Sequence, residues 1–260
     1  MHSSDEAART AGSTPTRNAA LRVGTAGWSV PSALGDRFPT DGTHLQRYAT
    51  RFPAVEINSS FYRAHRRTTY VRWAESVPDD FRFAVKLPKT ITHERRLQDC
   101  ADLVAGFAEE VGGLGHKRGP VLVQLPPSFA YPGEAADVFF AGLGAVLGGP
   151  IACEPRHPTW FTPAADAMLA RQRVARVAAD PAPAAGAERP GGWGGLAYIR
   201  LHGSPRIYWS AYDDAAVSGH AHEAQALAAA GAETWVIYDN TAAGAAAKDA
   251  LTFASHLRPR

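Results

Sequence analysis

Short apolar runs along this chain are interrupted by a polar residue at every second position. The clearest run is VEIN at 55–58, and VKL at 85–87, VQL at 123–125, IACE at 151–154 and IRLH at 199–202 share the pattern. Because alternate residues of a strand lie on opposite faces, the aliphatic residues of each run share one face and the polar residues the other. The pattern predicts strands that pack on helices with one face and converge on a polar site with the other.

Segments with strand patterning alternate along the chain with segments of helical periodicity. Strands are expected near 21–26, 54–58, 81–87, 120–125, 151–155, 173–179, 196–202 and 233–239. Helices are expected over 43–52, 69–77, 99–111, 134–147, 163–171, 221–230 and 244–257. About eight such βα units predict an α/β fold of the TIM-type (β/α)8 barrel kind. In the sixth unit, the Gly- and Pro-rich segment 181–195 predicts an irregular loop in place of a helix, and a candidate flap.

Length and composition narrow the class of protein. The 260 residues suit residues 21–260 as a single barrel domain, and 45% hydrophobic with 20% charged residues is an ordinary globular composition. The first 20 residues have no apolar segment of the secretory kind, so a flexible tail is expected there. No apolar run is long enough to span a membrane, and the two cysteines suggest no disulfide scaffold, so a cytoplasmic protein is expected.

The parity of the strands directs several charged side chains into the carboxyl end of the barrel, where barrel active sites lie. The candidate catalytic residues are Glu56, Lys86, Glu154, His157, Arg200 and His202. Unpaired charges in a packed interior are unfavourable, so an open ligand-binding mouth explains them well. The alternative is a set of ion pairs that satisfy one another, such as Glu56 with Lys86 and Glu154 with Arg200.

Residues on the neighbouring strand ends and loops extend this candidate site. The candidate substrate-binding residues are Trp28, Asn58, Tyr62, Lys89, His93, Gln124, Arg156, Trp160 and Asn240. Basic residues interleaved with aromatic rings suit an anionic ligand with flat groups, such as a nucleotide or nucleic acid. The alternative is separate local roles, with the aromatic rings packing at the rim and the arginines solvated.

A divalent metal is a second interpretation of the same residues. The candidate ligands are His93, His157, His202, Glu56, Glu154, Asp180 and Asp239. Against a metal, Lys86 and Arg200 crowd the same space, and the chain has no HExxH pair. The sequence therefore assigns no metal site and no definite cofactor, and metal binding stays open.

The strand ends also carry a family resemblance. The motifs are VGTAGW at 23–28, VEINSSFY at 55–62, FAVKLPKTITH at 83–93, VQLPPSF at 123–129, EPRHPTWF at 154–161, YIRLHG at 198–203 and YDNT at 238–241. Their order resembles that of the domain of unknown function 72 (DUF72, YecE-like) family, from about Leu21 to Leu257. The resemblance implies a TIM-type barrel, similar to those of endonuclease IV and xylose isomerase, which are metal-dependent. The N-terminal 20 residues and the loop after Asp180 depart from the family pattern.

The leading hypothesis is an enzyme that acts on an anionic, phosphate-containing substrate, with nucleic acid as the best guess and phosphodiester hydrolysis as a candidate reaction. Lysines and arginines of the site would hold the anion, a glutamate would act as general base, and a histidine as acid. Asn58, Gln124 and Asn240 would orient the substrate. The alternatives are a metal-dependent hydrolase or isomerase, and a non-catalytic module that binds nucleic acid or a nucleotide. The oligomeric state stays open.

Overall fold

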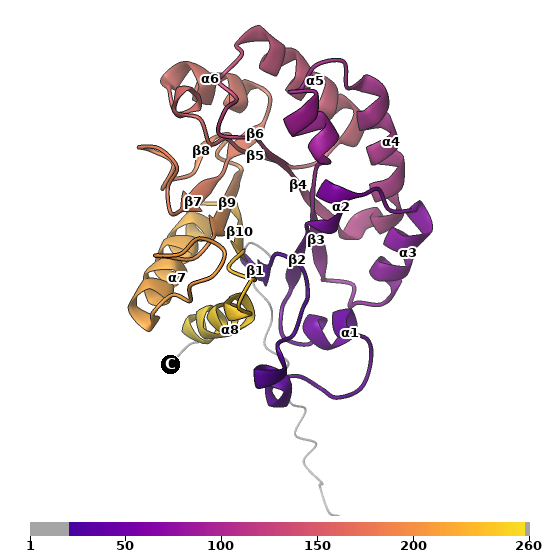
Figure 1. Cartoon of the computed structure of the whole chain (residues 1–260), viewed down its shortest axis with the longest axis vertical. Coiled ribbons are helices and arrows are strands. Elements are labelled where there is room, and N and C mark those ends of the chain that lie inside the picture. The colour runs from indigo at the N-terminus through magenta and orange to yellow at the C-terminus, as the bar shows by residue number, and fades with distance from the viewer. Residues whose placement is uncertain (1–20, 258–260) are drawn as a thin grey trace, which may run out of the picture.

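The computed structural model describes residues 21–257, with strands in the middle and helices around them (Figure 1). The strands are β1 (Leu21–Thr25), β2 (Ala54–Ile57), β3 (Arg82–Lys86), β4 (Arg118–Gln124), β5 (Ile151–Glu154), β6 (Val174–Arg176), β7 (Ala178–Asp180), β8 (Gly191–Gly192), β9 (Leu196–Leu201) and β10 (Glu233–Tyr238). The α-helices are α1 (His44–Ala49), α2 (Ser59–Tyr62), α3 (Arg67–Glu75), α4 (Ala101–Val111), α5 (Glu134–Leu147), α6 (Pro163–Arg171), α7 (Asp214–Ala229) and α8 (Ala245–His256). The alternation of strand and helix agrees with the predicted order.

The strands form two sheets that meet at both edges. One sheet has the order β1-β10-β9-β7 and the other β2-β3-β4-β5-β6-β8, and every pair is parallel except β6 with β8. An isolated bridge between Ala26 and Glu56 joins the sheets on one side. On the other side, β6 pairs with β5 while β7, just after it in the chain, pairs with β9. The ladders therefore surround a common interior, although hydrogen bonding is interrupted at these two places.

Two apolar layers follow from the period-two pattern. The inner layer contains Ala54, Ala84, Leu122, Ala152, Ala175, Val177, Leu196, Tyr198, Trp235 and Ile237. The larger outer layer contains the residues of opposite parity, including Val55, Val85, Val123 and Ile199, packed with the apolar faces of the helices. Small alanines on β2, β3, β5 and β6 leave space inside for the large Tyr198 and Trp235 rings, which stack at 6.1 Å between centroids. The polar residues of the site continue the inner parity, one layer closer to the carboxyl ends of the strands.

Capping side chains fix where several helices begin. The Thr43 hydroxyl accepts from the Gln46 amide, and the Gln46 side chain accepts from the Thr43 amide, so α1 begins with a capping box. The predicted helix 221–230 begins earlier in the structure, at Asp214, because the Asp213 carboxylate accepts from the Ala216 amide as an N-cap. The first turns of α7 lack a regular apolar periodicity, which is why the sequence pattern missed them.

The sixth unit has no helix between β7 and β9, as the Gly/Pro-rich sequence predicted. Instead, β8 pairs antiparallel with β6, and Gly192 has a positive φ of 65°. A Cβ at Gly192 would lie only 2.5 Å from the Val174 carbonyl oxygen, so this close pairing requires glycine. The Arg176 side chain donates to the carbonyl oxygens of Gly186 and Arg189 and thereby fixes the loop. The interpretation of this loop as a flap stays a prediction.

Within residues 21–257, none of the helices combines the length and apolar character that a membrane crossing requires. The predicted tail at residues 1–20 lies outside the described part of the chain.

Candidate functional site

The candidate site lies at the carboxyl ends of the strands, because parallel strands end at the same side of the barrel. Glu56, Lys86, Gln124 and Glu154 come from the last residues of β2 to β5 and continue the inner parity. Arg200 and His202 from β9 and Asp239 after β10 complete the set. All seven side chains belong to residues that are no more than 8% exposed. The sequence had singled out each of them, although Asp239 only as a candidate metal ligand.

The Arg200 guanidinium is the centre of this set and is fully buried. Its Nε and Nη2 donate to the two carboxylate oxygens of Glu56 at 3.1 and 2.7 Å. Nη1 donates to Oε2 of Glu154 at 2.7 Å, and Nη2 also donates to Oδ2 of Asp239 at 2.8 Å. The planar guanidinium thus engages three carboxylates with charge-assisted hydrogen bonds. Carboxylates inside the protein thus engage four of the five N–H donors of Arg200, and the guanidinium is fully buried, which leaves it little capacity for a substrate anion.

A second set of contacts surrounds Arg200. His202 lies with Nε2 3.0 Å from Oε1 of Glu154 and with Nδ1 3.2 Å from Oδ2 of Asp239. The Gln124 amide donates to Oε2 of Glu154 at 3.1 Å. The Tyr198 hydroxyl donates to Oε2 of Glu56 at 2.7 Å. These bonds hold the carboxylates in place, and they agree in part with the alternative of ion pairs that satisfy one another, with Arg200 rather than Lys86 as the partner of Glu56.

The electrostatics of this cluster favour the charged form of its members. Burial opposes ionisation of Glu154, but the charges of Arg200 and His202 outweigh it and hold the pKa of Glu154 well below its ordinary value. Burial likewise opposes the charge of Asp239, yet Arg200 and His202 lower the pKa of that carboxyl. For His202, the nearby Glu154 charge and hydrogen bonds to both carboxylates outweigh burial and raise the pKa. Because both ring nitrogens face carboxylate oxygens, the site favours the protonated form of His202, which donates from both nitrogens.

Lys86 belongs to the same layer but has a different environment. The residue is 8% exposed, and its Nζ makes no hydrogen bond or ion pair with any residue of the described range. Nζ lies 4.2 Å from the centroid of the Phe61 ring, in a cation–π contact. Burial and the charge of Arg200 lower the pKa of Lys86 to about 8, although the three carboxylates act in the opposite direction. Lys86 is therefore a buried amine that is partly deprotonated near neutral pH.

Arg156 and His93 lie with Lys86 on the open side of the charge cluster. Arg156 donates from Nη2 to Oε1 of Glu154 at 3.2 Å and to the Tyr208 hydroxyl at 2.9 Å, and its side chain is 23% exposed. The His93 ring packs edge-on against Phe61 at 5.0 Å between centroids. Burial lowers the pKa of His93, and the positive charges of Lys86 and Arg156 lower it further. His93 therefore lies close enough to both Lys86 and Arg156 for their charges to act on it.

The segment 203–212, between β9 and α7, covers this open side. The Tyr208 ring lies edge-on against His202 at 5.4 Å, and Tyr208 has a positive φ of 66°. Next to it, Trp209 is 45% exposed, and Arg206 lies over the Trp209 ring at 4.4 Å. The mouth is thus bordered by Tyr208, Trp209 and Arg206, which the sequence pattern had not assigned to the site.

Two predicted substrate-binding residues have buried side chains whose hydrogen-bond partners lie inside the protein. Trp160 is fully buried, and its indole N–H donates to the Phe129 carbonyl oxygen at 2.9 Å. Asn240 is also fully buried, and its amide donates to the Ser210 carbonyl oxygen and to the Asp249 carboxylate. Trp160 is a core residue because apolar rings pack around it, and Asn240 fastens the segment 203–212 to α8.

Other predicted rim residues have local partners. His157 accepts from the Thr159 amide as a helix cap, and Lys89 pairs with Glu94 at 3.3 Å in solvent. Trp28 packs edge-on against Trp73 at 5.1 Å. The structure does not bring His157, Lys89 or Trp28 into the network around Arg200.

Asn58 and Tyr62 stand at the start and the end of the short helix α2. Asn58 is its N-cap residue, and the Asn58 Oδ1 atom is buried without a hydrogen-bond partner among the described residues. Tyr62 is 73% exposed, with its ring edge-on to Phe61 at 5.0 Å. Asn58 therefore has a buried, unpaired acceptor, and Tyr62 presents an exposed ring.

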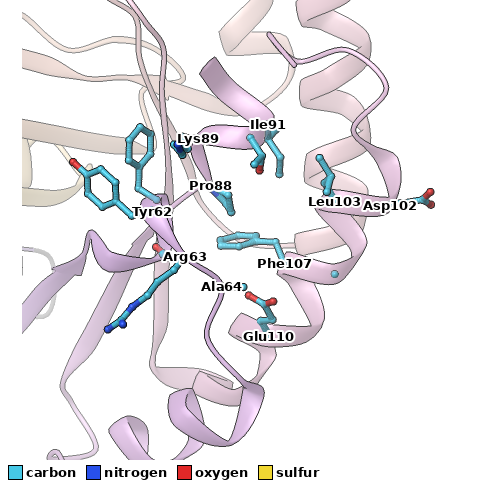
Figure 2. Close-up of a pocket in the computed structure, with 14 residues that line it drawn as sticks. Tyr62, Arg63, Ala64, Pro88, Lys89, Ile91, Asp102, Leu103, Phe107 and Glu110 are labelled. Carbon is cyan, nitrogen blue, oxygen red and sulfur yellow. The ribbon is translucent and has the colours of Figure 1, made fainter. Parts of the chain in front are cut away.

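A cavity of about 280 Å³ lies beside this side of the mouth, between the loops that follow β2 and β3 and the helix α4 (Figure 2). Its lining includes Phe61, Tyr62, Pro88, Lys89, Leu103, Phe107 and Glu110. The Phe107 ring extends from α4 into the cavity, and the Glu110 carboxylate lies below it, as Figure 2 shows. Phe61 contributes both to the cavity wall and to the contact with Lys86, so the cavity adjoins the side of the mouth where Lys86 lies.

Within residues 21–257, no group of three or more His, Cys, Asp or Glu side chains has an arrangement suited to a metal ion. The three carboxylates that converge on the axis all bind the Arg200 guanidinium instead. The Arg200 guanidinium thus occupies the position that a metal ion would need among Glu56, Glu154 and Asp239.

Comparison with known proteins agrees with this geometry. The family model described as "Protein of unknown function DUF72" matches residues 22–260. The chain belongs to the DUF72 family. The UPF0759 protein YecE of Escherichia coli K12 is 36% identical over 121 residues, which cover 46% of this chain and 43% of YecE. The UPF0759 protein YunF of Bacillus subtilis 168 is 26% identical over 150 residues, 55% of this chain and 53% of YunF. The chain thus matches about half the length of these relatives.

Solved structures confirm the predicted barrel fold. A DUF72 family protein from Enterococcus faecalis V583 superimposes with a TM-score of 0.78 at 20% identity, over 92% of this chain and 96% of its own. A DUF72 family protein from Thermotoga maritima MSB8 gives 0.74 at 23% identity, over 91% and 98%. A sugar phosphate isomerase/epimerase from Parabacteroides distasonis gives 0.52 at 10% identity, over 83% and 90%. These similarities place the DUF72 chain among TIM-barrel proteins.

Sequence reasoning missed parts of the site. Tyr198 has the inner parity of Arg200, so strand alternation already pointed to it. Asp239, which the sequence offered only as a metal ligand, likewise follows Ile237 by two residues. Tyr208 and Trp209 lie in a segment without regular structure, and no periodicity in the sequence indicates that this segment folds back over His202.

Proposed function

We propose that this DUF72 chain is a barrel enzyme whose substrate carries a phosphate group, bound at the carboxyl mouth of the barrel by Arg156 with Lys86 beside it. The observation that carries the proposal is the contrast in free donors. Arg200 uses four of its five N–H donors on carboxylates, whereas Nε and Nη1 of Arg156 make no hydrogen bond with the described residues. A partly exposed guanidinium with free donors suits a phosphate, because its fork matches two phosphate oxygens.

His93 is the candidate proton carrier in this scheme. Its Nδ1 lies 2.9 Å from the Thr92 hydroxyl, and its Nε2 has no partner among the described residues. Because burial and the charges of Lys86 and Arg156 lower its pKa, the imidazole is neutral at neutral pH and its free nitrogen is available to accept a proton. A bound phosphate would offset the positive charges nearby, so substrate binding itself would raise the pKa of His93.

The buried carboxylates take a positioning role in this proposal. Glu154 accepts from both Arg156 and Arg200, so the central cluster holds the phosphate-binding arginine in one orientation. This differs from the initial hypothesis that Glu56 or Glu154 is the general base, because both carboxylates are enclosed and already accept several charged donors.

Nucleic acid is the second candidate substrate, favoured by the aromatic border of the mouth. Tyr208 is 39% exposed, Trp209 is 45% exposed and Tyr62 is 73% exposed, and Arg206 lies on the Trp209 ring. Exposed rings beside arginines are suited to stacking bases of a single strand. A fold neighbour is named a sugar phosphate isomerase/epimerase, and phosphorylated sugars are therefore the first small ligands to screen.

The test is calorimetric titration with glycerol 3-phosphate, a panel of sugar phosphates and a single-stranded oligothymidylate. Arg156→Met is expected to weaken binding of the phosphate ligand at least about tenfold, since a charged hydrogen bond contributes roughly 1.5–3 kcal/mol. Arg156→Lys should retain part of the affinity, and Arg171→Met, which removes an exposed arginine on α6, should retain all of it. Equal affinities for Arg156→Met and the parent would overturn the proposal.

The salt dependence of binding separates the two substrates. Affinity for a nucleic acid strand falls steeply with salt because several phosphates release counterions, whereas one phosphate gives a shallow slope. A steep slope for the oligothymidylate, together with loss of binding in Trp209→Ala, would favour nucleic acid.

A further inference from the structure

Lys86 stands apart from the other lysines of the chain. The sequence contains four lysines, Lys86, Lys89, Lys117 and Lys248, and the structure describes them all. Lys117 is buried but donates to the carbonyl oxygens of Ala74 and Val77 at 2.8 Å each. Lys89 is paired with a glutamate, and Lys248 is exposed on α8. Only Lys86, among the four, combines burial with an amine that has no hydrogen-bond acceptor.

We propose that Nζ of Lys86 is a nucleophile that forms an imine with a carbonyl carbon, so that the substrate is a phosphorylated aldehyde or ketone. The inference rests on the proposed function only for the phosphate group, which Arg156 would hold while Lys86 reacts with the carbonyl. The position of Lys86 favours this role, because it ends strand β3 at the mouth of the barrel and adjoins the cavity lined by Phe61.

The surroundings of Lys86 keep a much larger fraction of its amine unprotonated than in an ordinary lysine. Burial, followed by the charge of Arg200, lowers its pKa to about 8, against the opposing charges of Glu154, Glu56 and Asp239. At pH 7 about a tenth of such an amine is free, against about 0.04% for an ordinary lysine of pKa about 10.4. A desolvated lysine next to another cation is a recognised way to activate an amine as a nucleophile.

His93 is placed to move the protons that imine formation requires. Lys86 Nζ and the His93 ring both contact Phe61, at 4.2 and 5.0 Å from its centroid. The Lys86 lone pair attacks the carbonyl carbon, the C–N bond forms, and the carbonyl π electrons move to oxygen. His93 accepts a proton from nitrogen and returns it to that oxygen, which gives a carbinolamine. A second proton, taken up from solvent water, protonates the hydroxyl group, the C–O bond breaks, and water leaves. The product is a protonated imine on Lys86, and the step needs no oxidant or reductant.

The test traps this imine on the intact protein by reduction. The protein is incubated at pH 7 with glycolaldehyde phosphate and sodium cyanoborohydride, which delivers hydride to the iminium carbon and leaves a stable secondary amine. Peptide mass spectrometry then measures the modified fraction of each lysine. We expect Lys86 to be modified at least about tenfold more than Lys89 or Lys248, because its free-amine fraction is far larger although a less basic amine is also less nucleophilic.

Two variants make the result decisive. Lys86→Arg should remove the main adduct, and Lys248→Arg should leave it unchanged. Because the four lysines are compared within the parent protein, the measurement holds even if Lys86→Arg folds poorly. Equal modification of Lys86, Lys89 and Lys248 would overturn the inference.

The failures of the two proposals are distinguishable. If glycerol 3-phosphate binds in an Arg156-dependent manner but no adduct forms on Lys86, the imine is refuted and the proposed function stands. If glycolaldehyde without phosphate modifies Lys86 as efficiently as glycolaldehyde phosphate, and no phosphate ligand binds, the nucleophile stands and phosphate recognition is refuted.

Discussion

The two sides of the barrel mouth surround a buried cation with opposite kinds of partner. On the β9 side, Arg200 donates four charge-assisted hydrogen bonds to three carboxylates. On the β3 side, Lys86 is nearly as buried but contacts the face of an aromatic ring and no acceptor. Burial raises the free energy of any charge, and only the Arg200 side compensates fully. The comparison distinguishes Arg200, a cation that three carboxylates hold in place, from Lys86, a cation without a hydrogen-bond acceptor.

The difference follows from the chemistry of the two side chains. A guanidinium presents planar donors that satisfy several carboxylates at once, and it keeps its proton at all physiological pH values. A lysine amine is a point charge that loses its proton when burial is uncompensated. The side of the mouth with Arg200 is therefore suited to holding geometry, and the side with Lys86 to chemistry.

Removal of the Arg200 cation should give the largest effect on this comparison. In Arg200→Met, Glu56, Glu154 and Asp239 stay buried without their cation, and the free energy of unfolding should fall by about 3–5 kcal/mol. Urea denaturation of the variant and the parent measures the loss. Arg171→Met, which removes an exposed ion pair with Asp137, should cost less than about 1 kcal/mol. Similar losses in both variants would contradict a structural role for Arg200.

Removal of the Lys86 amine should have the opposite sign. The folded-state pKa of about 8 lies below the unfolded value, so the folded protein holds the Lys86 proton less tightly. The parent thus bears this penalty below pH 8 and loses it as the pH rises towards about 10.4, where the unfolded lysine also deprotonates. Lys86→Met should stabilise the protein by about 1–3 kcal/mol at pH 7, and less at pH 10.

Urea midpoints of Lys86→Met and the parent at pH 7 and pH 10 measure this effect. Lys248→Met serves as the control, because an exposed lysine should change the unfolding free energy by less than about 0.5 kcal/mol. Destabilisation in Lys86→Met at pH 7 would show that the amine has a partner that the structure does not reveal.

The period-two pattern was sufficient to predict the barrel and the polar layer inside it. Residues such as Glu56 and Arg200 reach the interior because every second residue of a strand does so. Parity could not show which charges pair, because pairing depends on strand order around the barrel. The sequence offered Glu56 with Lys86 as one pair, whereas β9 brings Arg200 to both Glu56 and Glu154.

Residues outside the strands were harder to predict. Trp160 and Asn240 follow strand ends directly, so their position suggested the site, but tertiary packing directs both side chains into the structure. Tyr208 reaches Arg156 from 52 residues away in the sequence, through a segment with no periodic signal. Local patterns fix which face a strand residue takes, and they contain no information on how a loop folds back.

The Tyr198 hydroxyl tests how strongly the Arg200 side depends on neutral donors. Tyr198→Phe removes the 2.7 Å hydrogen bond to Glu56 without changing the ring that stacks on Trp235. Because one charged hydrogen bond is lost while Arg200 still pairs with Glu56, we expect a loss of about 2 kcal/mol by urea denaturation. Tyr62→Phe, at a ring that is 73% exposed, should have no measurable effect. A negligible loss in Tyr198→Phe would assign the hold on Glu56 to Arg200 alone.

The smallest expected effect is a pH dependence that comes from His202. Its pKa is raised in the folded state, so its contribution to stability is complete below about pH 6.5 and disappears as the pH rises through the folded-state pKa. Above pH 8, deprotonation of Lys86 makes the unfolding free energy rise with pH, which is opposite to the effect of His202. Urea denaturation is therefore measured across this pH range in the Lys86→Met background, with and without His202→Gln. We expect the His202-containing protein to lose more unfolding free energy than His202→Gln as the pH rises above 6.5. Parallel pH profiles would mean that Glu154 and Asp239 do not hold the imidazolium, and that Arg200 alone balances the charge on the Arg200 side.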